Sequence, residues 1–226
     1  MVDLATLAAV PMKAESDLRM VEIIMLKWKC PDVEAKCAER IIRYTDWPFK
    51  LNVYDNRPNT PNTARAWNKL VMDSTCGYVC LIDSDAFVPD VKPCWLTRMM
   101  ACFEQPGCRL VVPVTDRCST VRQRAGRAVE YPRAEKFDDT WSGFCFLFHR
   151  NLLDDIGEFD EEFVGYGQDS EFAERLTRNG GGTYIRRDVF VQHLHGASFK
   201  AATSSGEHDS VADRAYAQEL FARKTT

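Results

Sequence analysis

Segments typical of buried strands alternate along this chain with segments of helical periodicity, and this alternation constrains the fold more than any other feature. Val21–Leu26, Phe49–Tyr54 and Tyr78–Ile82 have the length and content of strands. Between them, Pro31 and Pro61 suit the first turns of helices. The alternation predicts an α/β fold with a mixed, mostly parallel, Rossmann-like sheet flanked by crossover helices.

Each of these two helices is expected to have an apolar face. The first places Val33, Cys37 and Ile41 four residues apart. The second is expected to take Thr60 as its N-cap and Pro61 as its first residue. Both helices therefore have a side that can cover a sheet.

The second half of the chain continues the pattern less regularly. Leu110–Val114, Thr183–Ile185 and Val189–Val191 are expected strands, and Asp169–Arg178 is an expected helix that ends before three consecutive glycines. Residues 201–226 form a polar tail that is helical near its end. No repeat or low-complexity tract divides the chain, so we expect one domain of 226 residues.

Composition indicates a folded globular protein without a membrane span. The chain is 45% hydrophobic and 27% charged, and its net charge of −4 gives no general attraction to nucleic acid or anionic membranes. No stretch is long and apolar enough to cross a bilayer, and Met1–Ala14 lack the features of a signal peptide. The nine cysteines include no C-x-x-C pair, so we expect reduced, mostly buried thiols in a cytoplasmic protein rather than zinc ligands.

Polar residues that can bind ligands follow three of the expected strands. Asp55 follows the second strand, Asp83 and Asp85 follow the third, and His193 and His195 follow the last. In open α/β sheets, ligands bind beyond the carboxyl ends of the strands. We therefore expect a binding site at this edge of the sheet.

Asp83 and Asp85 are candidate metal ligands. A hard divalent cation prefers oxygen ligands, and a diphosphate supplies more of them. Such a pair also occurs in ordinary Asp-rich loops, but its position in LIDSDAFV favours the metal site. His193 and His195 are alternate residues of an expected extended segment and should share a face. Either one could complete a manganese site, and a hydrogen-bonded pair near a turn is the alternative.

Three more polar residues are candidates for the binding site: Asp169, Asp55 and Arg65. Asp169 begins a helix in VGYGQDSEF and could accept a proton from an attacking hydroxyl, although the helix dipole alone also favours Asp there. The flanking Gly165 and Gly167 suit close approach of a ligand or a mobile turn. Asp55 and Arg65 could contact a nucleobase, ribose or phosphate, or could be a turn residue and a surface charge.

Basic residues concentrate between positions 117 and 136, opposed only by Glu130 and Glu135. They are Arg117, Arg122, Arg124, Arg127, Arg133 and Lys136. Such a run is usually a solvated face. Its place between the carboxylate pair and Trp141-Ser142-Gly143 suits contact with an anion equally well, and the segment could then hold an anionic acceptor or fold as a lid over the donor diphosphate.

Taken together, the segments resemble the inverting glycosyltransferases of family two, which have the GT-A fold. The resemblance extends from about Val21 to Phe199 and covers most of the chain. NTARAWNKLVMDSTCGYVCLIDSDAFV is similar to that family's helix, strand and D-x-D block. SGFCFLFHRNLLDDIGEFDEEFVGYGQDSEF is similar to its acceptor-side block, and VQHLHGASF is similar to its closing His-containing strand.

The resemblance implies roles on the donor side. Asp55 would contact the nucleobase, and Asp83 would lie near the ribose or the metal. Asp85 would bind Mn²⁺ or Mg²⁺ and, through it, the donor diphosphate. His195, directly before Gly196, is the better candidate than His193 for the remaining metal contact.

The resemblance also implies roles on the acceptor side. Asp169 would be the general base, at the second position of a pair that is often acidic in the family. Gln168 stands at the first position of this pair. Trp141 and Gly143, together with Gln168, are the candidate acceptor-side residues.

The implied function is metal-dependent hexosyl transfer. An acceptor hydroxyl would attack the anomeric carbon of a nucleotide sugar, with a UDP-sugar as the family default, and the configuration would invert. Residues 20–90 would form the donor side and residues 91–200 the acceptor side. The acceptor stays open among a soluble glycan, a metabolite, a protein and a modified base in nucleic acid, and the oligomeric state stays open as well.

Two other functions compete with this interpretation. A sugar-phosphate nucleotidyltransferase shares a related fold and metal carboxylates, but such chains have a Gly-rich basic loop where this one reads LKWKCPD. A non-catalytic carbohydrate- or partner-binding domain on a transferase scaffold is the other alternative, and Gln168 is its only sequence indication.

Overall fold

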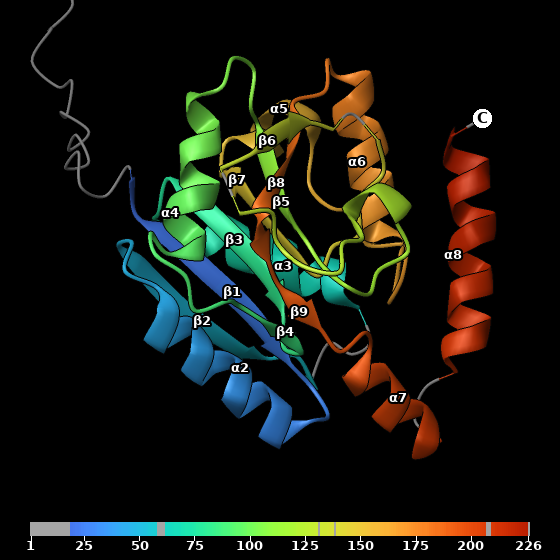
Figure 1. The fold of residues 1–226 in the computed structure, drawn as a ribbon. Helices are drawn as coiled ribbons and strands as arrows, with labels where there is room; N and C mark the ends of the chain where they lie inside the picture. The colour runs from blue at the N-terminus through green and yellow to red at the C-terminus, as the bar shows by residue number, and fades with distance from the viewer. Residues whose placement is uncertain (1–18, 58–61, 131, 138, 207–208, 226) are drawn as a thin grey trace, which may run out of the picture.

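The computed structural model describes residues 19–57, 62–130, 132–137, 139–206 and 209–225. A seven-stranded sheet with the order β2-β1-β3-β7-β5-β8-β6 runs through the molecule (Figure 1). Its strands are β1 (Val21–Lys27), β2 (Phe49–Asp55), β3 (Tyr78–Asp83), β5 (Leu110–Val114), β6 (Ala134–Lys136), β7 (Cys145–His149) and β8 (Thr183–Phe190). β4 (Ala86–Phe87) and β9 (Gln192–His193) form a separate two-stranded sheet.

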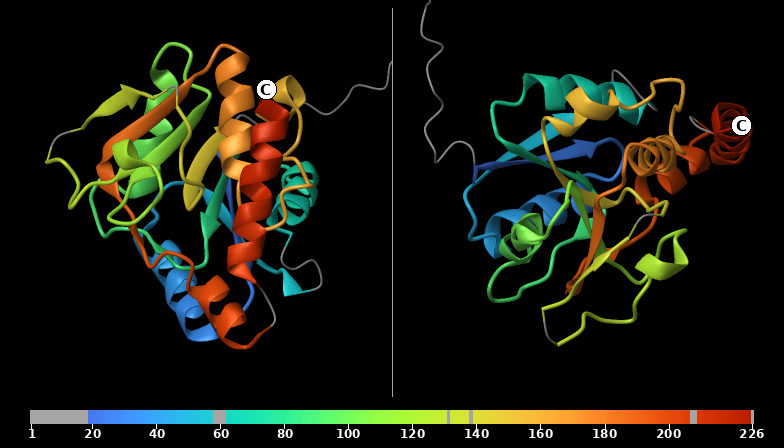
Figure 2. Two further views of the ribbon diagram at one scale, coloured as in Figure 1. Left: turned by 90° about the vertical axis from the view of Figure 1, so that its right-hand side faces the viewer. Right: turned by 90° about the horizontal axis from the view of Figure 1, so that it is seen from above.

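Helices cover both faces of the large sheet, as the alternation of strands and helices predicts (Figure 2). On one face lie α2 (Pro31–Tyr44) and α4 (Trp95–Met100), and on the other lie α3 (Thr63–Asp73), α5 (Leu152–Ile156) and α6 (Gln168–Arg178). Successive strand residues point to opposite faces, so Ile23 and Ile24 belong to different apolar clusters. Short 3-10 turns follow at Ala101–Glu104 and Val121–Gln123. The α/β class with a mixed, mostly parallel sheet is therefore confirmed.

The carboxyl ends of β1, β2 and β3 meet at one edge of the sheet. The three strands are parallel, with Leu26 in register with both Tyr54 and Asp83. Lys27 is in register with Asp55. The chain therefore leaves all three strands at the same level, and Asp83 stands at this edge.

The second half of the sheet differs from the sequence expectation. β7 lies antiparallel between β3 and β5, in a segment that was not expected to be a strand. β8 is continuous from Thr183 to Phe190, where two separate strands were expected. The polar residues inside β8 explain the error, because Arg186 and Asp188 are buried as an ion pair. Pairing compensates the cost of burying these charges.

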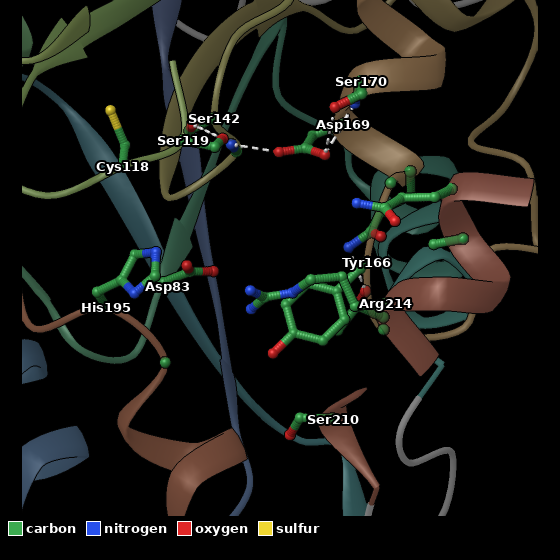
Figure 3. Close-up of a pocket in the computed structure, with 18 of the residues that line it drawn as sticks. Asp83, Cys118, Ser119, Ser142, Tyr166, Asp169, Ser170, His195, Ser210 and Arg214 are labelled. Carbon is green, nitrogen blue, oxygen red and sulfur yellow. Dashed lines mark hydrogen bonds between the residues drawn. The ribbon is translucent and has the colours of Figure 1, made fainter. Parts of the chain in front are cut away.

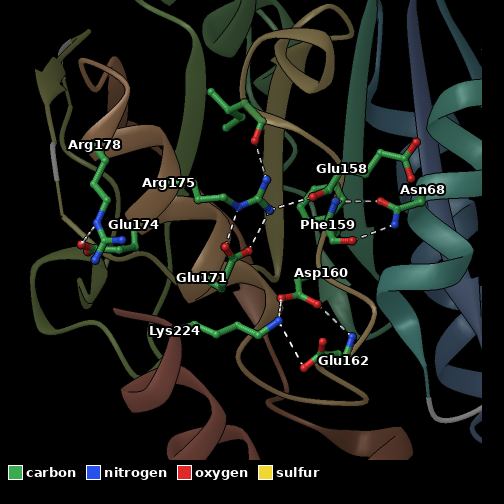
Figure 4. Close-up of polar contacts among 11 residues, drawn as sticks. Asn68, Glu158, Phe159, Asp160, Glu162, Glu171, Glu174, Arg175, Arg178 and Lys224 are labelled. Carbon is green, nitrogen blue, oxygen red and sulfur yellow. Dashed lines mark hydrogen bonds and ion pairs between the residues drawn. The ribbon is translucent and has the colours of Figure 1, made fainter. Parts of the chain in front are cut away.

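The chain ends in two helices, α7 (Ala197–Ser204) and α8 (Ser210–Thr225), which we call the C-terminal arm. α8 lies outside α6 and is separate from the large sheet (Figures 1 and 2). It packs through Ala217 and Leu220 against Phe163 in a small apolar cluster of its own. Lys224 near the end of α8 forms ion pairs with Asp160 and Glu162 (Figure 4). The helical tail expected from the sequence is therefore present.

The described start of α3 lies at Thr63, two residues after the expected first residue. Thr60 and Pro61, the expected N-cap and first residue, are not among the described residues. The described helix begins at Thr63, and Asn62 caps it by accepting a 2.9 Å hydrogen bond from the N–H of Arg65. Among the described residues, no helix is both long enough and apolar enough to span a membrane.

Candidate active site

A large cavity of about 970 Å³ opens beyond the carboxyl end of β3. Figure 3 shows Asp83 and Asp169 on different sides of the cavity, and His193 and Gly143 also line it. Residues of the C-terminal arm complete the lining (Figure 3). The cavity therefore brings together side chains from the middle and the end of the chain that sequence reasoning proposed separately.

Asp83, Asp85 and His193 form one compact group. Their ligand atoms lie within 4.8 Å of one another. His193 Nε2 lies 3.2 Å from Asp85 Oδ1 and 3.4 Å from Asp83 Oδ2. The group forms because β4 follows Asp85 directly and pairs with β9, with Ala86 opposite His193. Two carboxylates and an imidazole this close together are a donor set that suits Mn²⁺.

Main-chain contacts hold this group in place. His193 Nδ1 lies 3.1 Å from the carbonyl oxygen of Arg117, to which an Nδ1–H would donate. His193 Nε2 is buried and has no well-aligned hydrogen bond to a described residue. Asp85 Oδ2 accepts a 2.8 Å hydrogen bond from the N–H of Ala197, which begins α7. A histidine whose Nδ1 donates to a carbonyl presents Nε2 to a metal, so the residues fit a divalent cation.

The electrostatics of the group are those of a cation site. Burial lowers the pKa of His193, but the charges of Asp83 and Asp85 outweigh this effect and raise it to about 10. Burial raises the pKa of the Asp83 carboxyl above its usual value. Burial acts in the same direction on Asp85, but the adjacent charge of His193 and the hydrogen bond from the Ala197 N–H hold its pKa below the usual value. Without a metal ion, a proton on His193 supplies the positive charge that the carboxylates favour, and a metal ion bound here would replace that proton.

His195 does not join the two carboxylates in the way the sequence led us to expect. The backbone φ of His195 is 62°, so the extended segment ends before this residue. The two histidines therefore do not share one face of a strand. His193 is buried against the carboxylates, whereas His195 is exposed and lines the large cavity. Their rings are 5.6 Å apart. Burial, with the nearby charges of His193, Lys200 and Arg214, lowers the pKa of His195.

Asp169 projects into the cavity from the first turn of α6 (Figure 3). Its Oδ2 accepts a 2.7 Å hydrogen bond from the N–H of Gly143, and its Oδ1 accepts one of 2.8 Å from the N–H of Ser170. Burial raises the pKa of Asp169 above its usual value despite these donors, and the charge of Asp83 adds to the effect. The result is an oriented carboxylate with raised basicity, as a general base requires.

The acceptor-side candidates have different environments. Gly143 lines the cavity, and so does Gln168, whose Nε2 donates a 2.8 Å hydrogen bond to Thr63 Oγ1. The Oε1 of Gln168 is buried without a partner among the described residues. Trp141, by contrast, is 1% exposed and packs on Phe146 in the core. The structure therefore places Trp141 behind the cavity wall and not in the cavity.

A small cavity of about 80 Å³ adjoins the carboxylates at the ends of β1 and β2. Trp28 and Asn56 line it together with Asp83 and Asp85. Asn56 is 2% exposed, and its Oδ1 has no hydrogen-bond partner among the described residues. Sequence reasoning missed Asn56, although it directly follows the strand that ends at Asp55.

Asp55 and Arg65 line neither cavity. Asp55 forms a bidentate ion pair with Arg57, and this hydrogen bonding lowers its pKa to about 2. Arg65 is exposed on α3 and pairs with Glu161 at 3.0 Å. The structure therefore does not bring either residue to the metal group.

The basic segment between positions 117 and 136 borders the large cavity. Cys118 and Ser119 line the cavity, while Arg124 and Arg127 are exposed. Arg122 stacks over the ring of Phe137 at 4.7 Å, and Arg133 pairs with Glu135. The segment is therefore a partly paired, solvated rim of the cavity.

Comparison with known proteins identifies the fold. No protein-family model and no curated protein sequence matches the chain. Among solved structures, TarS of S. aureus is similar with a TM-score of 0.56 and 12% identity, over 80% of this chain and 62% of that one. GalNAc-T7 with UDP, GalNAc and Mn²⁺ is similar with a TM-score of 0.58 and 13% identity, over 83% and 48%. A Drosophila β-1,4-galactosyltransferase 7 with manganese, UDP-Gal and xylobiose is similar with a TM-score of 0.59 and 11% identity, over 81% and 74%.

These similarities show that the chain has the GT-A glycosyltransferase fold, as the resemblance implied. The chain matches less than two thirds of the TarS and GalNAc-T7 structures. At these identities the comparison shows the fold, and the chemistry has to be argued from the site.

Proposed function

We propose that this chain is a metal-dependent inverting glycosyltransferase that moves a sugar from a UDP-sugar to an acceptor hydroxyl. One observation carries the proposal: Asp83, Asp85 and His193 form a group able to hold a metal ion, and Asp83 and His193 line the same cavity into which Asp169 projects. A cation site for a leaving diphosphate and a base for an incoming hydroxyl are the two parts that such a transfer needs.

In this proposal, Asp83, Asp85 and His193 hold Mn²⁺ or Mg²⁺. Such an ion, when bound, neutralises the charge that develops on the departing diphosphate. The chain contributes the arrangement of the ligands. The Arg117 carbonyl orients His193, and the Ala197 N–H orients Asp85. Two similar structures contain manganese with UDP or UDP-Gal, which supports this assignment.

Asp169 removes the proton from the acceptor hydroxyl. The N–H groups of Gly143 and Ser170 aim its carboxylate into the cavity. Its raised pKa makes it a stronger base than an ordinary aspartate. In the proposed reaction the hydroxyl attacks the anomeric carbon from the side opposite the leaving diphosphate, so the anomeric configuration inverts.

The uracil edge of the donor faces the small cavity at the ends of β1 and β2, and the ribose lies outside it, because about 80 Å³ is too small for a whole nucleoside. Asn56 faces this cavity with a buried, unpartnered amide oxygen that can accept a hydrogen bond from the N3–H of uracil. Asp55 stays a candidate for contact with the nucleobase, and this contact requires its ion pair with Arg57 to open. Residues 20–90 thus supply most of the donor side, and residues 91–200 supply Asp169 and the acceptor side.

The acceptor enters through the large cavity beside Gly143 and Gln168. Its volume of about 970 Å³ leaves room for a sugar and a further acceptor group. Arg124 and Arg127 are exposed in the segment that borders the cavity through Cys118 and Ser119, and they keep a modified base in nucleic acid as the second candidate acceptor, beside a glycan, metabolite or protein.

A turnover assay tests the proposal. Wild-type protein, Asp85→Ala and Asp169→Asn are incubated with Mn²⁺ and a panel of UDP- and GDP-sugars, and release of the nucleoside diphosphate is followed with water or added glycans as acceptors. We expect release by the wild type from a UDP-sugar and its loss in both variants. NMR of the released sugar then reports the anomeric configuration. Absence of turnover with every donor, or equal turnover in Asp85→Ala, would contradict the proposal.

A further inference from the structure

Basic side chains of the C-terminal arm line the large cavity. Lys200 of α7 and Arg214 of α8 both border it, as does His195 just before the arm. The charges of Lys200 and Arg214 both reach the ring of His195, so these groups converge on one region. Within the described part of the chain, neither Lys200 nor Arg214 forms an ion pair with a carboxylate.

Arg214 is held in a defined position. Its guanidinium lies over the ring of Tyr166, 4.7 Å from the ring centre. Figure 3 shows Arg214 extending from α8 past Tyr166 into the cavity, with its guanidinium toward Asp83. A planar guanidinium stacked on an aromatic ring keeps its N–H groups free for a bidentate contact with an oxyanion.

The charge of the proposed donor site explains why a further cation is needed. Asp83 and Asp85 together cancel the charge of one divalent ion. The charge of a bound diphosphate is then left without compensation from this group. Arg214 and Lys200 both line the cavity and can supply positive charge to a bound diphosphate.

We propose that Arg214, positioned by Tyr166, binds the donor diphosphate and stabilises it as the leaving group. This inference rests on the proposed function. It assigns to the C-terminal arm a direct part in donor binding, with Lys200 as a weaker second cation. The guanidinium is directed toward Asp83 in Figure 3, which favours the diphosphate over an anionic acceptor as its ligand.

The arm has anchors that do not involve Arg214. Ala217 and Leu220 pack on Phe163, and Lys224 near the end of α8 pairs with Asp160 and Glu162 (Figure 4). A substitution of Arg214 removes its contact with Tyr166, and we expect these other anchors to keep α8 in place. Arg223 is exposed in the same helix and does not line the cavity, which makes it a matched control.

Calorimetric titration with UDP and NMR titration with uridine, both with Mn²⁺, test the inference on the wild type, Arg214→Gln, Arg214→Lys and Arg223→Gln. We expect Arg214→Gln to weaken UDP binding by about tenfold or more, because a hydrogen-bonded charge is lost. Arg214→Lys should fall between Arg214→Gln and the wild type, and Arg223→Gln should bind as the wild type does. Uridine, which has no phosphate, should bind equally to all four proteins.

Two results would overturn the inference alone: UDP affinity that is unchanged in Arg214→Gln, or uridine affinity that falls as much as UDP affinity. Unchanged UDP affinity with a raised acceptor KM would assign Arg214 to the acceptor instead. If the wild type binds no nucleoside diphosphate with Mn²⁺, the proposed function fails, and the inference fails with it.

Discussion

The main-chain N–H of Gly143 donates a 2.7 Å hydrogen bond to Oδ2 of Asp169. This contact joins the segment before β7 to the first turn of α6 and fixes the carboxylate that faces the cavity. A Cβ atom at position 143 would lie 2.8 Å from the Cβ of Asp169, closer than real Cβ contacts allow. Glycine is therefore required here for the position of Asp169.

Gly143→Ala should lower kcat by about a hundredfold, because displacing a catalytic group by roughly 1 Å can cost that much. UDP affinity should change little, since Asp83 of the cation group lies on a different side of the cavity from Asp169. Gly126→Ala is the matched control, because a Cβ there meets nothing within 4 Å. Steady-state kinetics with UDP titration checks the prediction, and an equal loss in both variants would count against a specific role for Gly143.

The pH dependence of turnover should report Asp169. A general base acts only when deprotonated, and burial raises the pKa of Asp169. Activity should therefore fall on acidification at a pH above about 3.9, the value of an ordinary aspartate. The measurement is the pH profile of kcat at saturating Mn²⁺ and donor. Residual activity of Asp169→Asn should lack this acidic limb, and an unchanged limb in the variant would assign it to another group.

The two histidines should differ in their effect on the metal. His193 Nε2 lies near both carboxylates, whereas His195 is exposed after a backbone turn. His193→Ala should weaken Mn²⁺ binding by about tenfold or more, as loss of a ligand or of its support does. His195→Ala should retain Mn²⁺ affinity within a few-fold. Titration followed by the electron paramagnetic resonance signal of free Mn²⁺ decides between them, and the reverse order would restore His195 as the ligand.

Stability should depend on a buried charge far from the cavity. Asp188 is 1% exposed, pairs with Arg186 at 2.6 Å and with Arg98 at 3.3 Å, and accepts from the N–H of Arg133. Asp188→Ala should lower the free energy of unfolding by about 3–5 kcal/mol, because Arg186 is left buried without compensation. Asp73→Ala breaks only an exposed pair and should cost less than about 1 kcal/mol. Urea unfolding of both variants is the test, and similar midpoints would contradict this account.

The sequence was sufficient to predict the donor half of the fold. Strand length, helical periodicity and the polar residues after β3 are local signals, and the parallel pairing of β1, β2 and β3 confirms what they indicate. The meeting of Asp83, Asp85 and a histidine at one point follows from the rule that ligands bind at the carboxyl ends of such strands. The roles assigned to these residues remain predictions.

The parts that could not be predicted depend on contacts between distant segments. The polar Arg186 and Asp188 interrupt the apolar pattern of β8. One continuous strand is possible because Asp188 pairs with both Arg186 and Arg98. The φ of 62° at His195 has no signature in the residue type. Trp141 faces the core because Phe146 packs against it. Arg214 lies in a tail without motif and reaches the cavity only because α8 packs on Phe163.

The central claim is that Asp85 and its neighbours bind a metal ion through which the donor diphosphate is held. Calorimetric titration of UDP with and without Mn²⁺, on the wild type and on Asp85→Ala, tests it most directly. The account predicts that the wild type binds UDP only with Mn²⁺ and that Asp85→Ala has lost this binding. Metal-independent binding of UDP, or equal binding by Asp85→Ala, would contradict it.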